Sequence, residues 1–75
     1  MVKIYSTPTC VYCSTLKEYL KSRKIDFSDL DVSKNEKDLQ EMIKISGQMG
    51  VPVIDIDGEI IVGFDKERID QFLKI

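Results

Sequence analysis

Histidine is absent from this chain of 75 residues, and cysteine occurs only twice, at Cys10 and Cys13. The lack of histidine removes the commonest general base and the commonest metal ligand in proteins. Two cysteines are too few for a secreted scaffold that is held together by several disulfides. Outside such a scaffold, two thiols three positions apart indicate a catalytic or metal-binding pair.

An excess of charge of one sign is also missing. The chain has 11 Lys and Arg against 13 Asp and Glu, which gives a net charge of −2. This balance excludes a nucleic-acid binder driven by electrostatics, because no basic patch can neutralise phosphates. Hydrophobic residues make up 43% and charged residues 32%, which argues against disorder. We expect residues 1–75 to form a single small domain.

Long apolar runs are missing as well. No stretch approaches the roughly 20 apolar residues that a membrane helix needs. The first residues, Met1-Val2-Lys3-Ile4-Tyr5, run directly into an extended pattern, without the basic segment and apolar run of a signal peptide. We therefore expect a cytoplasmic protein that does not associate with membranes.

The hydrophobic pattern predicts the element order β-α-β-α-β-β-α. Alternation predicts strands over 2–5, 51–54 and 59–62, and a strand within 25–32 that is centred on 27–30. Helical spacing predicts helices over 10–24, 33–47 and after 65. Ser33 and Glu36 form a capping-box pattern at the start of the second helix, and Gly47 ends it. Asp57-Gly58 predicts a type I′ hairpin turn, and Asp65 caps the last helix. The sequence therefore predicts an α/β domain with a mixed four-stranded sheet.

A Cys-x-x-Cys motif begins at Cys10, where a strand ends and a helix begins. The first N–H groups of a helix have no partners within it and lie at the positive end of its dipole. We expect a Cys10 thiolate to accept hydrogen bonds from Tyr12 N–H, Cys13 N–H and the Cys13 thiol, which lower its pKa. Cys13 shares an apolar face with Leu16 and Leu20, where desolvation raises its pKa. Cys10 is the predicted nucleophile, and Cys13 the predicted resolving thiol.

Two other interpretations of the cysteine pair remain open. A structural zinc site usually needs four ligands, so a second chain or a carboxylate would have to complete it. Free cysteines are also commonly buried in cores without any chemistry. The position of the motif at the first strand–helix junction favours a redox pair.

Further along the chain, Val51-Pro52 stands just before the third predicted strand, where proline is tolerated. This segment alone favours a trans bond, because only about 5–6% of X-Pro bonds are cis. Tyr12, Met49, Val51 and Phe64 are expected to surround Cys10 as a small apolar docking patch, although core packing explains Phe64 nearly as well.

The order of these features resembles that of the glutaredoxins and their short glutaredoxin-like relatives in the thioredoxin superfamily. The likeness covers essentially the whole chain and includes the Gly-Phe-Asp segment that begins at Gly63. It implies a thioredoxin fold with strand order 2-1-3-4, with Cys10 as nucleophile and Cys13 as resolving thiol. It also implies that Pro52 is cis, which turns the Val51 backbone toward Cys10 and the substrate. Gly63, Phe64 and Asp65 would lie in the same substrate site.

The chain departs from glutaredoxins where those proteins hold the charged ends of glutathione. Basic residues are replaced by Thr7 and Met49, an acidic residue by Lys66, and the usual proline, threonine and first glycine of a pair by Val11, Gly50 and Val62. Val11 and Phe64 look like the glutaredoxin-like hydrogen donors of ribonucleotide reductase, which take electrons from thioredoxin reductase.

These observations predict an enzyme that reduces protein disulfides through its Cys10–Cys13 dithiol, as a monomer, with no bound cofactor and no metal. We expect a thioredoxin-reductase-type flavoenzyme to regenerate the dithiol, and ribonucleotide reductase is a candidate partner. Two alternatives stay open: an ordinary glutathione-dependent glutaredoxin, and a thioredoxin-fold binding module without catalysis.

Overall fold

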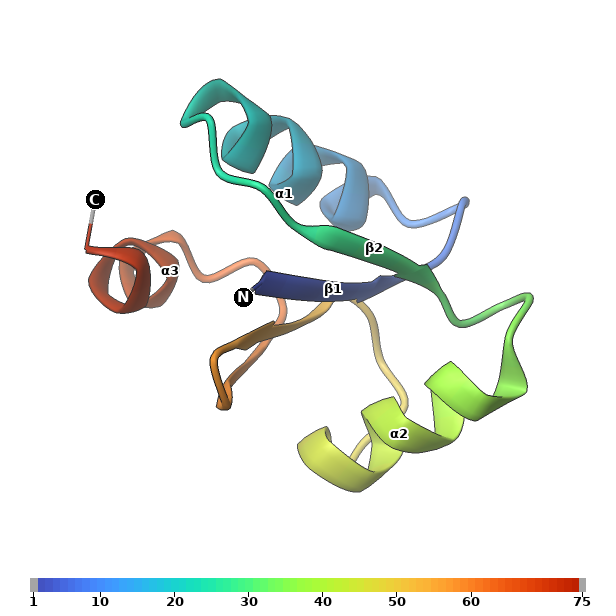
Figure 1. Cartoon of the computed structure of the whole chain (residues 1–75). Helices are drawn as coiled ribbons and strands as arrows, with labels where there is room; N and C mark the ends of the chain where they lie inside the picture. The colour runs from blue at the N-terminus through green and yellow to red at the C-terminus, as the bar shows by residue number, and fades with distance from the viewer. Residues whose placement is uncertain (1, 75) are drawn as a thin grey trace.

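The computed structural model describes residues 2–74, and within them the chain folds into four strands and three helices (Figure 1). The elements are β1 (Val2–Ser6), α1 (Val11–Ser22), β2 (Ser28–Asp31), α2 (Glu36–Ser46), β3 (Val53–Ile56), β4 (Glu59–Val62) and α3 (Lys66–Leu73). The predicted element order is confirmed. No helix between residues 2 and 74 is long and apolar enough to cross a membrane.

The four strands form one mixed sheet in the order β2-β1-β3-β4. Strand β1 pairs in parallel with β2 and antiparallel with β3, and β3 pairs antiparallel with β4. This is the strand order that the likeness to glutaredoxins implied. Because β1 is a central strand, the segment that follows it emerges in the middle of the sheet edge.

Helices cover both faces of the sheet, with α1 on one side and α2 on the other (Figure 1). Neighbouring side chains of a strand point to opposite faces. Ile4 of β1 therefore packs in a fully buried cluster with Leu16 of α1 and Ile69 of α3. Tyr5 faces the other way and packs against Met42 of α2. The first cluster therefore holds α1 against one face of the sheet, and the second holds α2 against the other.

The second and third strands differ slightly from the predicted bounds. Strand β2 covers Ser28–Asp31, within the predicted segment 25–32 and one residue beyond its predicted centre of 27–30, and it lies at an edge of the sheet. Strand β3 begins at Val53, two residues later than predicted, because Pro52 has no N–H to donate to a neighbouring strand. The Pro52 carbonyl instead accepts a hydrogen bond of 2.8 Å from the Gly63 N–H.

The capping-box interpretation of the second helix is wrong. The N-cap of α2 is Asn35, whose side chain accepts a hydrogen bond of 3.3 Å from the Asp38 N–H. Ser33 is occupied elsewhere, because its N–H and its hydroxyl both donate to the Asp31 carboxylate, at 2.9 and 2.5 Å. These bonds lower the pKa of Asp31. The end of the helix is as predicted, with Gly47 in the left-handed conformation.

The local signals in the last third of the chain are confirmed. Asp57 and Gly58 have φ values of 50° and 96°, as a type I′ turn requires. The Asp65 side chain caps α3 by accepting a hydrogen bond of 3.2 Å from the Arg68 N–H. The turn and the cap position β4 and α3 so that Ile61 and Ile69 pack into the hydrophobic core.

We expect Asn35→Ala to lower the free energy of unfolding by about 1 kcal/mol, because the orphan N–H at the start of α2 loses its acceptor. Ser33→Ala should cost less than about 0.5 kcal/mol, since Ser33 is exposed and does not cap the helix. Urea denaturation followed by circular dichroism measures both. A larger loss in Ser33→Ala than in Asn35→Ala would restore the capping box.

Candidate active site

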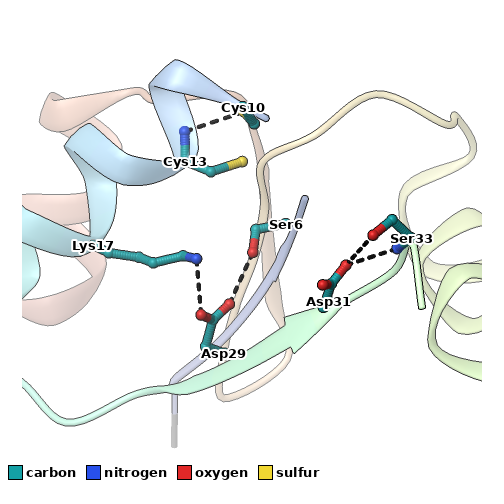
Figure 2. Close-up of polar contacts among 7 residues, drawn as sticks. All are labelled: Ser6, Cys10, Cys13, Lys17, Asp29, Asp31 and Ser33. Carbon is teal, nitrogen blue, oxygen red and sulfur yellow. Dashed lines mark hydrogen bonds and ion pairs between the residues drawn. The ribbon is translucent and has the colours of Figure 1, made fainter. Parts of the chain in front are cut away.

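The sulfur of Cys10 lies at the start of α1, above the centre of the sheet. Cys10 is the N-cap residue, with extended backbone, and its N–H donates to the Thr7 carbonyl at 3.2 Å. Its sulfur accepts a hydrogen bond of 3.2 Å from the Cys13 N–H (Figure 2). The predicted bond from the Tyr12 N–H is not formed between residues 2 and 74. A single backbone donor and the positive end of the helix therefore face this sulfur.

Cys13 lies one helical turn further on and is buried. Only 1% of its surface is exposed, and it packs beside Leu16 and Leu20 as the spacing predicted. Burial, together with its contact to Cys10, raises the pKa of Cys13 to about 11. The Thr7 backbone and the Lys17 charge act in the opposite direction. The direction is the one predicted for Cys13, and the two free thiols differ in exposure, since Cys10 is half-buried and Cys13 is buried.

The Val51 backbone approaches Cys10 from the other side of the site. The Val51–Pro52 bond is cis, as the resemblance implied, and Pro52 is fully buried. The Cys10 thiol donates to the Val51 carbonyl across 3.9 Å, although the two residues are 41 positions apart. Within residues 2–74 nothing accepts a hydrogen bond from the Val51 N–H. An unpaired backbone donor therefore lies beside the half-buried Cys10 thiol.

Large apolar side chains stand exposed around this point. Val11 is 76%, Tyr12 68% and Met49 69% exposed, and we call these three residues the apolar rim. Val11 and Tyr12 follow Cys10 in the chain, and Met49 lies in the loop that leads to Val51. The rim has no charged member. It shares Tyr12 and Met49 with the apolar patch predicted for this site, whereas Val51 of that patch is half-buried.

Phe64, Gly63 and Asp65 have structural contacts that account for them. Phe64 is half-buried against the core, with its ring centroid 6.0 Å from that of Tyr19, so core packing explains it. Gly63 has a φ of 84° and bonds the Pro52 carbonyl, which ties β4 to the cis-proline segment. Asp65 caps α3. The structure thus brings Val51 and Pro52 to the cysteines, and Gly63 to Pro52.

A polar group next to Cys13 was not predicted from the sequence (Figure 2). The Lys17 ammonium forms an ion pair of 2.8 Å with Asp29 of β2, and the Ser6 hydroxyl donates to the same carboxylate at 2.8 Å. Lys17 follows Cys13 by one helical turn, so both side chains leave α1 on the same face. The spacing of Cys13 and Lys17 could have predicted that their side chains lie close together. The pairing of Lys17 with Asp29 could not have been predicted, because it depends on how α1 packs against β2.

A metal site made only from this chain would need about four ligands. Between residues 2 and 74, no three Cys, Asp or Glu side chains converge closely enough to hold a metal ion. In the described part of the chain, Cys10 and Cys13 therefore have no third ligand.

The sheet order, the three helices and a thiol pair at the start of the first helix define a thioredoxin-like fold with a cysteine-based site. Residues 2–61 match the sequence model of the glutaredoxin family, and the chain belongs to that family, whose members are thiol oxidoreductases. It is 57% identical over 74 residues to a glutaredoxin-like 8.6 kDa protein of the rubredoxin operon of Clostridium pasteurianum, covering 99% of both chains.

Two further comparisons agree. Glutaredoxin 3 of Escherichia coli is 42% identical over 64 residues, which are 85% of this chain and 77% of that protein. The crystal structure of a glutaredoxin from Archaeoglobus fulgidus superimposes with a TM-score of 0.89 at 25% identity, covering 99% of this chain and 86% of the other. The expected family and fold are therefore confirmed.

Iodoacetamide at pH 7 should alkylate Cys10 well before Cys13. With a pKa of about 11, roughly one Cys13 in ten thousand is thiolate at that pH, and its sulfur is buried. Mass spectrometry of the alkylated peptides after timed quenching measures the order, with Cys10→Ser and Cys13→Ser as single-thiol controls. Earlier labelling of Cys13 would contradict the asymmetry of the pair.

Removing the Lys17 charge should raise the pKa of Cys13 further, because a nearby cation favours the thiolate. The test compares the pH at which Cys13 becomes reactive in Cys10→Ser with that in Cys10→Ser/Lys17→Gln. Lys21→Gln is the matched control, since Lys21 lies one turn further along the same helix. An unchanged profile in Lys17→Gln, or an equal shift in Lys21→Gln, would contradict this role.

Proposed function

We propose that this chain is a cytoplasmic dithiol–disulfide oxidoreductase that reduces disulfides in other proteins. The observation that carries the proposal is the asymmetry of the cysteine pair. Cys10 is accessible at the start of α1, whereas Cys13, one helical turn further on, has only 1% of its surface exposed. An exposed thiol that attacks and a buried thiol that resolves are what the dithiol reaction needs.

The proposed reaction transfers two electrons in two exchanges. The Cys10 thiolate attacks one sulfur of the substrate disulfide, forms a mixed disulfide and releases the first substrate thiolate. Cys13 then loses its proton to solvent and attacks the Cys10 sulfur, which releases the second substrate thiolate. The substrate gains two electrons and two protons, and the chain is left with a Cys10–Cys13 disulfide. Lys17 favours the second step by lowering the cost of the Cys13 thiolate.

The unpaired Val51 N–H supports binding of an extended substrate. An extended peptide beside Cys10 would accept a hydrogen bond from this N–H and donate to the neighbouring carbonyl, as in the pairing of two strands. These bonds involve backbone only, so they select for an extended chain near the disulfide and not for a particular side chain. The apolar rim then provides contacts that are independent of the substrate's charge.

The side chains around the site support a protein as electron donor in preference to glutathione. Glutathione has two carboxylates and an ammonium, and sites that select it use charged partners. Met49 is exposed and uncharged, and Lys66 is directed to Asp70, which its ammonium contacts at 3.0 Å. Each missing charged hydrogen bond costs about 1.5–3 kcal/mol, so two or three weaken binding by a few powers of ten.

The neutral rim suits a protein surface, since exposed apolar patches commonly mark protein contacts. We therefore propose that a thioredoxin-reductase-type flavoenzyme returns two electrons to the Cys10–Cys13 disulfide. The chain would act as a monomer, without a bound cofactor. The likeness at Val11 to the hydrogen donors of ribonucleotide reductase makes that enzyme a candidate electron acceptor.

The second candidate is an ordinary glutathione-dependent glutaredoxin. It is supported by the 42% identity to glutaredoxin 3 of Escherichia coli. A third reading, a thioredoxin-fold binding module without catalysis, would need neither thiol. The two enzymes differ in their electron donor, and the module differs from both in having no turnover.

NADPH oxidation with insulin as substrate separates these candidates. Thioredoxin reductase should support turnover at least about tenfold faster than glutathione with glutathione reductase, since the charged contacts to glutathione are missing. Cys10→Ser should abolish turnover, and Thr7→Lys/Met49→Arg should improve the use of glutathione. Faster turnover with glutathione in the unmodified chain would support the ordinary glutaredoxin, and full activity in Cys10→Ser would exclude Cys10 as nucleophile.

A further inference from the structure

The loop between α2 and β3 places the Val51 carbonyl beside Cys10, and the side chain of Gln48 makes hydrogen bonds within this loop. The Gln48 carboxamide bonds both backbone groups of Gly50. Its Nε2 donates to the Gly50 carbonyl at 3.0 Å, and its Oε1 accepts from the Gly50 N–H at 2.5 Å. Both backbone polar groups of Gly50, the residue that precedes Val51, are therefore hydrogen-bonded, although Gly50 is exposed to solvent.

The same carboxamide is anchored to the end of α2. The second N–H of Gln48 Nε2 donates to the Ser46 hydroxyl at 3.2 Å. The single hydrogen of the Ser46 hydroxyl is shared between two acceptors, the Met42 carbonyl at 2.6 Å and the Gln48 carbonyl at 3.1 Å. An amide side chain has two N–H donors and one oxygen, so every polar group of Gln48 is used. Hydrogen bonds thus connect the end of α2, through Ser46 and Gln48, to Gly50.

Glycine at position 50 is explained by space and not by backbone conformation. Its φ lies outside the left-handed range, where glycine would be needed for conformational reasons. A Cβ built at Gly50 would lie 2.7 Å from Gln48 Oε1 and 3.8 Å from its Cδ. A contact below 3.0 Å forces a shift, and the group that can move is the flexible end of the Gln48 side chain, so a side chain at position 50 displaces the carboxamide and disturbs its two bonds to that residue.

We propose that Gln48 is a positioning residue, and that Gln48 and Gly50 form a matched pair that holds the Val51 backbone in place beside Cys10 for an incoming protein disulfide. The role in substrate binding rests on the proposed function, whereas the pairing itself does not. Gln48 has no hydrogen bond to either cysteine in the described part of the chain. It acts on the reaction only through the loop.

A double-mutant cycle tests the pair. Gln48→Ala and Gly50→Ala should each raise the KM for reduced chain acting on insulin about tenfold, with kcat changed less than about twofold. The double variant should resemble either single variant, because each change breaks the same bonds. Gln40→Ala, an exposed glutamine of α2, is the matched control and should leave KM unchanged.

Two further measurements distinguish positioning from general stability. Reduction of hydroxyethyl disulfide, which is too small to need an extended backbone contact, should change less than about twofold in all variants. Hydrogen exchange at the Gly50 amide should accelerate about tenfold or more in Gln48→Ala, since this N–H loses its acceptor. Gln48→Glu keeps an acceptor but loses both donors, so it should protect this amide and restore KM only in part.

Additive effects of Gln48→Ala and Gly50→Ala on KM, or equal losses with insulin and with the small disulfide, would overturn the positioning role. An unchanged Gly50 exchange rate in Gln48→Ala would overturn the pairing itself. If the unmodified chain reduces neither insulin nor the small disulfide, the proposed function fails. The exchange rates of the single and double variants still decide in that case whether the pair exists.

Discussion

The hydrogen bond of 3.2 Å from the Cys13 N–H to the Cys10 sulfur is the contact on which the site depends. It makes Cys10 the N-cap of α1 and thereby fixes where the helix begins. Once the helix begins there, its 3.6-residue period turns Cys13 inward, onto the face that packs on the sheet. The exposure of one thiol and the burial of the other thus follow from a single choice of cap residue.

Burial of Cys13 has a cost that its surroundings partly offset. Taking a thiol out of water disfavours the thiolate, and the pKa of about 11 expresses this. Lys17 is held in place by Asp29, whose carboxylate also accepts a hydrogen bond from Ser6, and the Lys17 charge acts against the desolvation of Cys13. The Lys17 and Asp29 side chains are 22% and 46% exposed, so their ion pair adds little to stability. The effect of this ion pair is to keep the Lys17 charge close to Cys13, where it lowers the pKa of the thiol.

Most features encoded within a few residues were predicted from the sequence, whereas contacts between distant segments were not, apart from the strand order, which the resemblance to glutaredoxins implied. The cysteine motif, Gly47 and the Asp57-Gly58 turn are local signals, and all are confirmed. Ser33 failed as a cap because the Asp31 carboxylate, two residues earlier, competes for its hydroxyl. The contact of Lys17 with Asp29 depends on the distance between α1 and β2, and the hydrophobic periodicity of the sequence does not determine that distance.

The two sides of the site are built by different means. On one side, the α1 cap aims an N–H at the Cys10 sulfur, and this geometry comes from the helix. On the other side, the loop before Val53 is fixed by hydrogen bonds of its own, from the Gly63 N–H to the Pro52 carbonyl and between the Gln48 side chain and Gly50. Because both sides present backbone groups to the sulfur, the site is suited to a disulfide in any extended chain. In the proposed reaction, discrimination between partners would then fall to the apolar rim, whose three side chains make none of the hydrogen bonds described for the site within residues 2–74.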